Sequence, residues 1–250
     1  MNDELKFTVI SDTHYYSKKN FVDGFDKNKK PKPGQLFFSR SEEIVEHTFD
    51  CLCKNDTPDI VLISGDLTYN GERTSHDEMK AALKKLQQKG KRVYVITATH
   101  DYTTPRMPTY GIDKNDKYIE VESVNRTQLL KYYGDFGYNN AIAKHKSTMS
   151  YVAQLADGYR LFALNDDYGD PDCGFSDELM NWVKTEANNA KRDGQYIIAM
   201  THHPLVPPSP IYAAVAKGDM LNEYELRRNQ LSDLGFDFAV SYTHLTLPTT

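Results

Sequence analysis

Four short segments of the chain place carboxylate or imidazole side chains directly after an apolar run. They are Asp12-Thr13-His14, Gly65-Asp66, Thr99-His100-Asp101 and His202-His203-Pro204. Carboxylates and imidazoles together suit divalent metals of borderline softness, such as Mn, Fe, Co or Zn. Each residue alone is more often a turn former or a buried histidine that the backbone satisfies. Their joint occurrence after successive apolar runs therefore carries the prediction of a metal site.

A site of this composition suits phosphoester chemistry. Asp12 and His14 are two residues apart, so both side chains can point to one side of an extended backbone. The two oxygens of Asp66 could bridge a pair of metal ions, which would clamp a phosphate and lower the pKa of a bound water. His100 is then placed to act as a general acid or as a cationic donor to phosphoryl oxygens, with Asp101 available to orient it.

Strand and helix patterns alternate through the first hundred residues. Short apolar runs predict strands at 5–10, 60–63 and 92–97, and the middle run reads as a strand buried on both faces. A helix is expected after Ser39 or Ser41. Ser75 and Glu78 have the spacing of a capping box for a second helix. This alternation predicts an α/β fold with its functional groups at the ends of strands.

The second half of the chain continues with strand and helix signals. Alternating residues around Asp157-Gly158 predict a β-hairpin. Ser176 is expected to cap a helix, and residues 195–201 to form the strand that leads into His202. Asn222 is expected to cap a last helix, and a last strand is expected to begin at Phe236.

Two long segments interrupt this pattern. Residues 17–38 are Lys-rich and broken by prolines, and we expect a surface loop there. Residues 102–148 hold many tyrosines and a probable helix near 125–133. Such an excursion is typical of a lid or a substrate-binding loop. The alternative is a surface insertion whose tyrosines pack locally, and the sequence favours neither reading.

Composition narrows the class of protein. The chain has 250 residues and a net charge of −5, so no basic surface indicates nucleic acid as a partner. No apolar stretch is long enough to cross a bilayer. Three cysteines, Cys51, Cys53 and Cys173, make no disulfide framework, and a reducing cytoplasm is the expected location. Cys51 and Cys53 are read as residues on a helix face rather than as a metal pair.

The last eleven residues, 240–250, differ in character from the rest of the chain. They back-translate without conflict as the read-through of a sequencing-library adapter. We therefore expect native sequence to stop near Phe238 or Ala239, inside a strand. The alternative is a genuine polar tail.

In their order and types, the four segments resemble the motifs of the calcineurin-like metallophosphoesterase superfamily, most closely the branch that contains cyclic-nucleotide phosphodiesterases. The resemblance spans residues 5–239. It implies a four-layer αββα sandwich of mixed sheets, with one domain over 1–239 that carries 17–38 and 102–148 as loop or lid insertions. It also implies a dinuclear centre of Mn, Fe, Zn or Co in which Asp12 and His14 hold the first metal, Asp66 bridges and His202 holds the second.

The expected function is that of a hydrolase that attacks a small phosphomonoester or phosphodiester with metal-activated hydroxide, His100 assisting the leaving group. A non-catalytic protein that uses this fold as a binding scaffold is the alternative. A nuclease of the same superfamily is disfavoured by the acidic net charge.

Two departures from the family pattern concern the metals. Thr99 occupies the position of a metal-binding asparagine, and its hydroxyl is a shorter and weaker neutral ligand. The family also ends its site with Gly-His-x-His, whereas Ser241-Tyr242-Thr243-His244 lacks the glycine and the second histidine. Two ligands are thus missing, and we expect this chain to bind metal weakly and to fold marginally.

Overall fold

A computed structural model describes residues 4–22, 40–54, 56–115, 117–167, 173–207, 209, 211–212 and 217–241. The chain forms two compact units: Met1–Val93 with Thr99–Phe136, and Tyr94–Ala98 with Gly137–Thr250. Much of the expected surface loop, residues 23–38, and most of the suspect tail, residues 242–250, lie outside the described residues.

The first unit is built on a small parallel sheet. Its strands follow the order β1 (Phe7–Ile10), β2 (Ile60–Ser64) and β3 (Arg92–Ile96), and β3 begins in this unit with Arg92 and Val93. β1 runs parallel to β2, with Phe7 opposite Ile60 and Ile10 opposite Ile63. Every residue of β2 is buried, as expected for an uninterrupted apolar run at the centre of a sheet.

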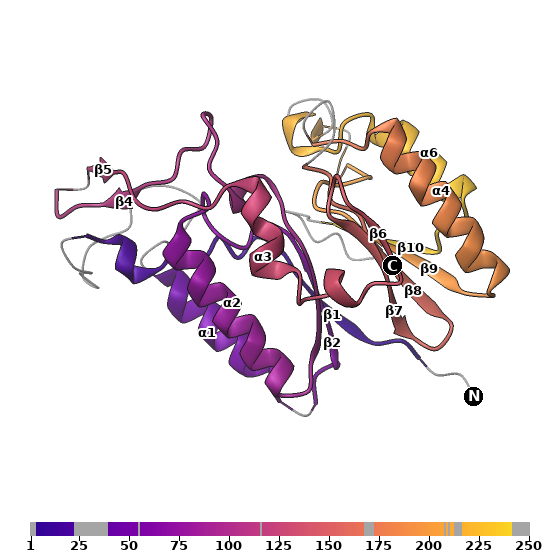
Figure 1. The fold of residues 1–250 in the computed structure, drawn as a ribbon, viewed down its shortest axis with the longest axis horizontal. Helices are drawn as coiled ribbons and strands as arrows, with labels where there is room; N and C mark the ends of the chain where they lie inside the picture. The colour runs from indigo at the N-terminus through magenta and orange to yellow at the C-terminus, as the bar shows by residue number, and fades with distance from the viewer. Residues whose placement is uncertain are drawn as a thin grey trace. The chain divides into compact units, whose positions relative to one another are not determined.

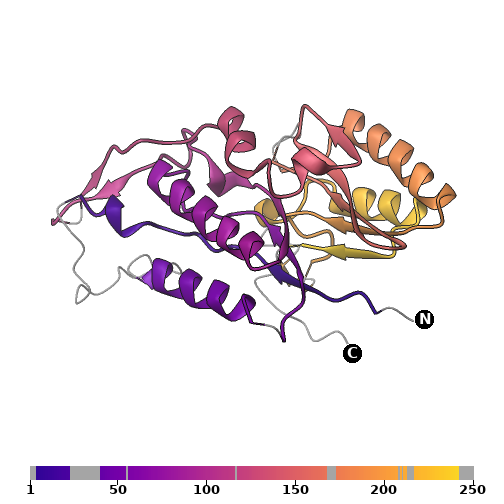
Figure 2. The same ribbon diagram turned by 60° about the horizontal axis from the view of Figure 1, so that its bottom comes forward.

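Two amphipathic helices belong to this unit. α1 (Ser41–Leu52) and α2 (Arg73–Gln88) lie side by side in both ribbon views (Figures 1 and 2). Their buried apolar residues recur every three or four positions, the spacing of one helix face: Val45, Phe49 and Leu52 in α1, and Met79, Leu83 and Leu86 in α2. The helix α1 begins at Ser41 itself, and its N-cap residue Arg40 makes no side-chain cap hydrogen bond.

The predicted capping box at Ser75 and Glu78 is wrong. α2 begins at Arg73, so Ser75 lies inside its first turn. The buried hydroxyl of Ser75 accepts hydrogen bonds from the Ser17 backbone at 3.1 Å and from the Asn20 side chain at 3.1 Å. Glu78 pairs instead with Lys19 at 3.0 Å. Tertiary partners therefore use both side chains that the local pattern had assigned to the helix end.

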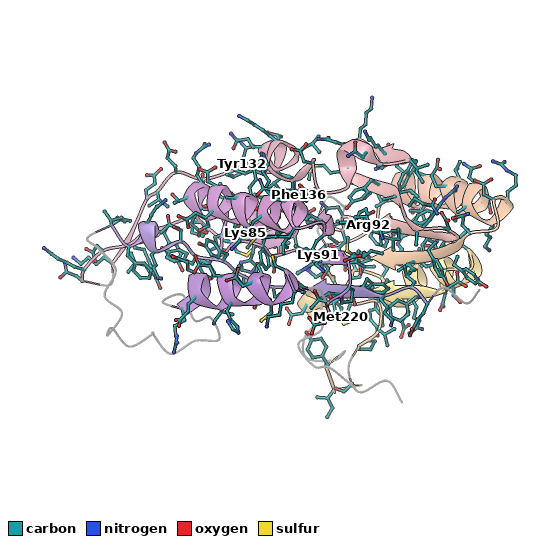
Figure 3. All side chains as sticks on the ribbon, turned by 90° about the horizontal axis from the view of Figure 1, so that it is seen from below. Lys85, Lys91, Arg92, Tyr132, Phe136 and Met220 are labelled. Atoms are coloured by element: carbon teal, nitrogen blue, oxygen red, sulfur yellow. The ribbon has the colours of Figure 1, made fainter. Side chains whose placement is uncertain are left out.

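Short elements complete the first unit. They are the 3-10 turns Lys18–Asn20, Thr99–Asp101 and Arg126–Gln128, the two-stranded pair β4 (Gly111–Ile112) and β5 (Tyr118–Ile119), and the helix α3 (Leu129–Tyr133). Lys91 lies just before β3 (Figure 3). Its buried ammonium donates to the backbone carbonyls of Thr57 at 3.0 Å and Pro58 at 3.2 Å. This cation ties the turn before β2 to the start of β3.

The second unit contains a mixed sheet of five strands. Their order is β10 (Phe238–Val240), β9 (Tyr196–Met200), β8 (Tyr159–Ala163), β7 (Ser150–Ala156) and β6 (Ala143–His145). β8, β9 and β10 are parallel, whereas β6, β7 and β8 are antiparallel. The predicted hairpin is confirmed, with Gly158 at φ 80° in the turn between β7 and β8.

Two helices complete the core of this unit. In α4 (Asp177–Arg192), the Ser176 hydroxyl caps the helix by accepting from the Leu179 amide at 3.1 Å, as the sequence predicts. The predicted cap at Asn222 is wrong, because α6 (Tyr224–Asp233) has Glu223 with φ 54° as its N-cap, which makes no side-chain cap hydrogen bond. The 3-10 turns Tyr138–Asn140 and Lys217–Asp219 also belong here. Across the described part of the chain, none of the helices has the length and apolar character that crossing a bilayer requires.

Candidate metal centre

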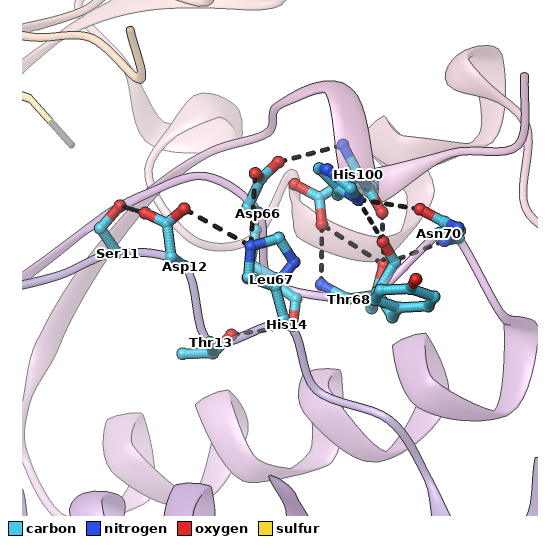
Figure 4. Close-up of polar contacts among 12 residues, drawn as sticks. Ser11, Asp12, Thr13, His14, Asp66, Leu67, Thr68, Asn70 and His100 are labelled. Carbon is cyan, nitrogen blue, oxygen red and sulfur yellow. Dashed lines mark hydrogen bonds and ion pairs between the residues drawn. The ribbon is translucent and has the colours of Figure 1, made fainter. Parts of the chain in front are cut away.

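The loops that follow β1 and β2 stay paired beyond the ends of the strands. The backbone amides of Asp12, His14 and Tyr15 donate in turn to the carbonyls of Gly65 (3.2 Å), Asp66 (3.0 Å) and Leu67 (2.9 Å). This pairing continues the parallel register of β1 and β2 into the loops. As a result, Asp12, His14 and Asp66 gather at one edge of the sheet (Figure 4).

All three of these residues adopt a left-handed backbone. The φ angles are 55° at Asp12, 38° at His14 and 52° at Asp66. For residues with a Cβ atom this region is sparsely populated, although Asp and His enter it more readily than most. A conformation of this kind costs on the order of 1–3 kcal/mol and persists where the surroundings enforce it, most often at functional sites. The inter-loop hydrogen bonds supply that enforcement.

The side chains of this edge form a compact donor set. Nε2 of His14 lies 3.5 Å from a carboxylate oxygen of Asp12 and 3.7 Å from one of Asp66. One ligand atom each from His14, Asp66 and His100 lie within 4.8 Å of one another. Ligands about 2.1 Å from a common ion lie at most about 4.2 Å apart, so a small adjustment would suffice. The donor types and the crowding of two carboxylates fit a divalent metal.

The electrostatics of His14 reflect these neighbours. Burial by itself lowers the pKa of His14, but its hydrogen bond to Asp12 and the charges of Asp66 and Asp12 outweigh burial, and the pKa is raised above its ordinary value. The other ring nitrogen, Nδ1, is buried and has no hydrogen-bond partner among the described residues. A metal ion would replace the proton that the two carboxylates otherwise attract to this ring.

His100 lies at the same edge and is held at both its backbone and its ring. Its amide donates to Asp66 Oδ1 at 3.0 Å. Nδ1 lies 2.6 Å from the Tyr69 carbonyl oxygen and 2.8 Å from Oδ1 of Asn70. Two acceptors at Nδ1 place a proton on that nitrogen, so Nε2 is the atom that offers a lone pair or, in the imidazolium, a second proton. The rings of His100 and His14 pack edge to face with centroids 4.7 Å apart.

Thr99 and Asp101 flank His100 in the same 3-10 turn. The carboxylate of Asp101 is fully buried and accepts from the Thr68 amide at 2.9 Å. The Asp101 carbonyl lies 2.9 Å from Nε2 of the buried His76. These contacts fix the turn that carries His100. Direct orientation of the His100 ring by Asp101, and metal coordination by Thr99, remain predictions.

Sequence reasoning missed Asn70, the side chain that contacts the His100 ring. Asn70 is buried, and its backbone amide donates to the carboxylate of Glu72 at 3.1 Å. Burial raises the pKa of Glu72 to about 7. The available signal was the polar run Tyr69-Asn70-Gly71-Glu72 shortly after Asp66, because buried polar side chains need partners and here the partner is a catalytic candidate.

In the second unit, His202 and His203 follow β9 as predicted. The buried carboxylate of Asp166 accepts from the amides of His202 (3.1 Å) and His203 (2.8 Å) and lies 3.0 Å from Nδ1 of His203. Burial lowers the pKa of His203, but Asp166 raises it well above its ordinary value. Sequence reasoning also missed Asp166, although Asn165-Asp166-Asp167 follows β8 just as the other acidic segments follow their strands. Metal binding by His202 remains a prediction.

Comparisons with known proteins agree with the motifs. The family model described as calcineurin-like phosphoesterase matches residues 5–245. A dimetal phosphatase from Danio rerio superposes with a TM-score of 0.58 at 12% identity, covering 91% of this chain and 77% of that one. A Staphylococcus aureus protein provisionally assigned as a 5′-nucleotidase gives a TM-score of 0.45 at 14% identity, covering 94% and 44%. Among curated protein sequences, none matches this chain. The predicted α/β sandwich fold is confirmed.

Proposed function

Because the chain belongs to the calcineurin-like phosphoesterase family, we propose that it is a metal-dependent hydrolase of small phosphomonoesters or phosphodiesters. The observation that carries this proposal is the donor set at the ends of β1 and β2. Nε2 of His14 lies 3.5 Å from a carboxylate oxygen of Asp12 and 3.7 Å from one of Asp66. Three residues there, Asp12, His14 and Asp66, hold a left-handed backbone, a conformation that clusters at functional sites.

In this proposal the residues divide into metal ligands and a proton donor. Asp12 and His14 would hold one divalent ion, and Asp66 would be shared with a second ion, for which His202 and Thr99 are the predicted further ligands. When bound, the ions supply charge that stabilises the phosphoryl oxygens and acidifies water. Ligand type alone admits Mn, Fe, Zn or Co, since carboxylate and imidazole donors accommodate each of these metals.

His100 is the residue that we propose moves a proton. Its Nδ1 proton is engaged by the Tyr69 carbonyl and the Asn70 side chain, which fixes the ring plane. In the imidazolium form, Nε2 carries a proton that can pass to the departing alkoxide or stabilise charge on the phosphoryl group. The amide of His100 donates to Asp66, so the proton donor and the shared ligand are coupled through one short hydrogen bond of 3.0 Å.

The test is metal content and hydrolysis measured on the same purified chain. The chain is loaded with Mn²⁺, Fe²⁺, Co²⁺ or Zn²⁺, the bound metal is quantified, and p-nitrophenyl phosphate and bis(p-nitrophenyl) phosphate are offered as substrates. We expect metal-stimulated release of p-nitrophenol that is lost in His14→Ala. His47→Ala is the matched control, because His47 is an exposed histidine on α1 of the same unit.

The outcomes separate hydrolase from scaffold. Metal-dependent turnover that needs His14 but not His47 supports the proposal. A folded chain that binds metal yet turns over neither ester contradicts it and favours the non-catalytic scaffold.

A further inference from the structure

Three tyrosines form a continuous aromatic row in the first unit. Tyr69 lies in the loop after β2, whereas Tyr110 precedes β4 and Tyr118 lies in β5. The Tyr110 and Tyr118 rings have centroids 4.0 Å apart, and the Tyr69 and Tyr110 rings 5.8 Å apart. The Tyr110 hydroxyl donates to the Tyr69 hydroxyl at 2.9 Å. Two segments distant in sequence therefore contribute to a single surface, which we call the tyrosine row.

The tyrosine row begins at the candidate metal centre. The ring centroid of Tyr69 lies 6.1 Å from that of His100 and 6.5 Å from that of His14. The Tyr69 carbonyl also accepts from Nδ1 of His100. These distances are typical of rings in contact. The alcohol group of a phosphate ester bound near these two histidines would therefore lie close to the Tyr69 ring.

Buried aromatic side chains support the inner end of the row, and its outer end is exposed. Tyr16 is fully buried, packs edge-on against Tyr69 at 6.1 Å, and donates its hydroxyl to the Tyr110 carbonyl at 3.0 Å. Phe21 packs against Tyr16 in turn at 5.5 Å. Tyr69 and Tyr110 are half-buried, and Tyr118 is 57% exposed. The innermost ring of the row is therefore fixed by its neighbours, whereas the outermost ring is largely accessible to solvent.

The tyrosine row is also compatible with an anionic ligand. Burial raises the pKa of Tyr69, and burial together with the Tyr69 hydrogen bond raises the pKa of Tyr110. Both phenols therefore stay neutral at physiological pH and add no negative charge beside a phosphate. Neutral aromatic faces with hydroxyl groups at their edges are well suited to stack on planar rings and to contact polar substituents.

We propose that the tyrosine row binds a planar aromatic ring on the alcohol side of the substrate, so that the substrates are nucleoside or aryl phosphate esters rather than aliphatic ones. This inference rests on the proposed phosphoesterase function, because the row gains its meaning from the adjacent phosphate site. It favours the substrate-loop reading of the 102–148 segment over a surface insertion that packs only on itself.

The test compares ligands that differ only in the ring. Adenosine 5′-monophosphate is measured against ribose 5-phosphate, which has the same 5′-phosphate but no base. The readout is kcat/KM where the metal-loaded protein hydrolyses them and the dissociation constant where it does not. We expect the base to improve either quantity by about tenfold, as stacking on one or two aromatic side chains does. Dissociation constants for phenyl phosphate against cyclohexyl phosphate then distinguish an aryl preference from a nucleoside preference.

Variants of Tyr118 assign the preference to the tyrosine row. Tyr118→Leu is expected to reduce the advantage of adenosine 5′-monophosphate over ribose 5-phosphate to about twofold or less, whereas Tyr118→Phe keeps it. Tyr196→Leu is the matched control, because Tyr196 is 56% exposed and stacks on Tyr159 in β8 of the other unit.

Each outcome decides one of the two proposals. The proposal that the tyrosine row binds an aromatic ring is overturned by either of two results. One is equal kcat/KM or equal dissociation constants within both ligand pairs, and the other is a loss in Tyr118→Leu that is the same for ligands with and without the ring. Ring-selective binding without hydrolysis of any ester supports ring binding by the tyrosine row and contradicts the proposed phosphoesterase function.

Discussion

The strand ends of the two units use the same residue types in opposite ways. After β1 and β2, the side-chain atoms of Asp12, His14 and Asp66 face one another, with His14 Nε2 at 3.5 and 3.7 Å from two carboxylates. After β8 and β9, the carboxylate of Asp166 is occupied by two backbone amides and by the ring of His203. The first arrangement concentrates donor atoms, whereas the second joins two loops.

The backbone distinguishes these arrangements more clearly than the sequence does. Asp12, His14 and Asp66 have positive φ angles, while Asp166, His202 and His203 are absent from the positive-φ residues of the described chain. A carboxylate that caps neighbouring amides lowers the energy of its loop, whereas a crowded donor set raises it until a cation binds. The comparison therefore predicts that substitutions after β2 act mainly on metal binding and those after β8 mainly on stability.

The largest expected effect is that of Asp66→Asn. An asparagine oxygen can still accept from the His100 amide, so the fold should survive, but the charge that we propose for metal binding is lost. We expect metal affinity and metal-dependent kcat/KM to fall by at least about 100-fold, more than typical losses for residues behind a ligand. Titration of metal into the apo chain measures this. Asp157→Asn, in the exposed β7–β8 turn, is the control, and equal affinities for the two variants would break the comparison.

Asp166→Asn should act on stability. Removing one partner of a buried, hydrogen-bonded pair costs roughly 3–5 kcal/mol, because the other charge stays buried. The free energy of unfolding, measured with urea at pH 7, should fall accordingly. Asp193→Asn breaks a half-exposed pair with Arg160 and should cost less than about 1 kcal/mol. Similar losses of unfolding free energy in both variants would show that Asp166 does not stabilise the fold by joining the two loops.

Asn70→Ala tests whether the His100 ring is positioned by its neighbour. Loss of the acceptor 2.8 Å from Nδ1 leaves only the Tyr69 carbonyl and allows the ring to turn. We expect kcat to fall by about 10-fold to 100-fold with little change in KM, as for residues that orient a site. The pH–rate profile should also shift, because Nδ1 of the imidazolium loses a partner. A variant that loses stability but keeps the wild-type profile would contradict this role.

The smallest effects concern pH and two buried groups behind His100. Burial lowers the pKa of His76 from 6.5 to about 3. As the pH falls, the His76 ring is therefore protonated in the unfolded chain before it is protonated in the folded chain. The stability contributed by neutral His76 is complete above pH 6.5 and is lost by about 1.4 kcal/mol per pH unit as the pH falls toward 3. Burial raises the pKa of Glu72 from 4.5 to about 7, so the folded chain binds this proton more tightly than the unfolded chain does. The contribution of Glu72 to the free energy of unfolding therefore grows by a similar amount per pH unit as the pH falls from 7 to 4.5.

These two slopes oppose each other between pH 4.5 and 6.5, and single variants should separate them. In Glu72→Gln the free energy of unfolding should fall more steeply with acidification than in the wild type. In His76→Gln it should fall less steeply or rise. Urea unfolding at several pH values measures both slopes. Parallel pH curves for the two variants would be inconsistent with the assigned shifts.

Much of the fold could be predicted because its signals are local. The buried run of β2, the Asp157-Gly158 hairpin and the Ser176 cap each depend on a few consecutive residues, and each is found as predicted. The capping box at Ser75 failed because Ser17 and Asn20, almost sixty residues away, compete for the same hydroxyl. Propensity describes only the neighbours along the chain, whereas the fold adds neighbours in space.

The candidate site was predictable in its residue types but not in its supports. Asp12, His14, Asp66 and His100 were selected as polar residues after apolar runs, and the structure gathers them at one edge. Asn70 and Asp166 were missed because their roles depend on which atoms they meet, and an asparagine or aspartate in a loop is ordinarily a turn former. The left-handed backbone was not predictable either, since none of those three positions is a glycine.

The left-handed residues also bear on how this chain can drift under mutation. Glycine occupies positive φ without the steric cost that Asp12, His14 and Asp66 incur. A lineage freed from the need to hold a cation would gain stability by accepting glycine at position 12 or 14, in steps that leave the surrounding hydrogen bonds of the backbone intact. A few stabilising substitutions would therefore suffice to abolish metal binding, and only continued selection for the ligands would prevent them.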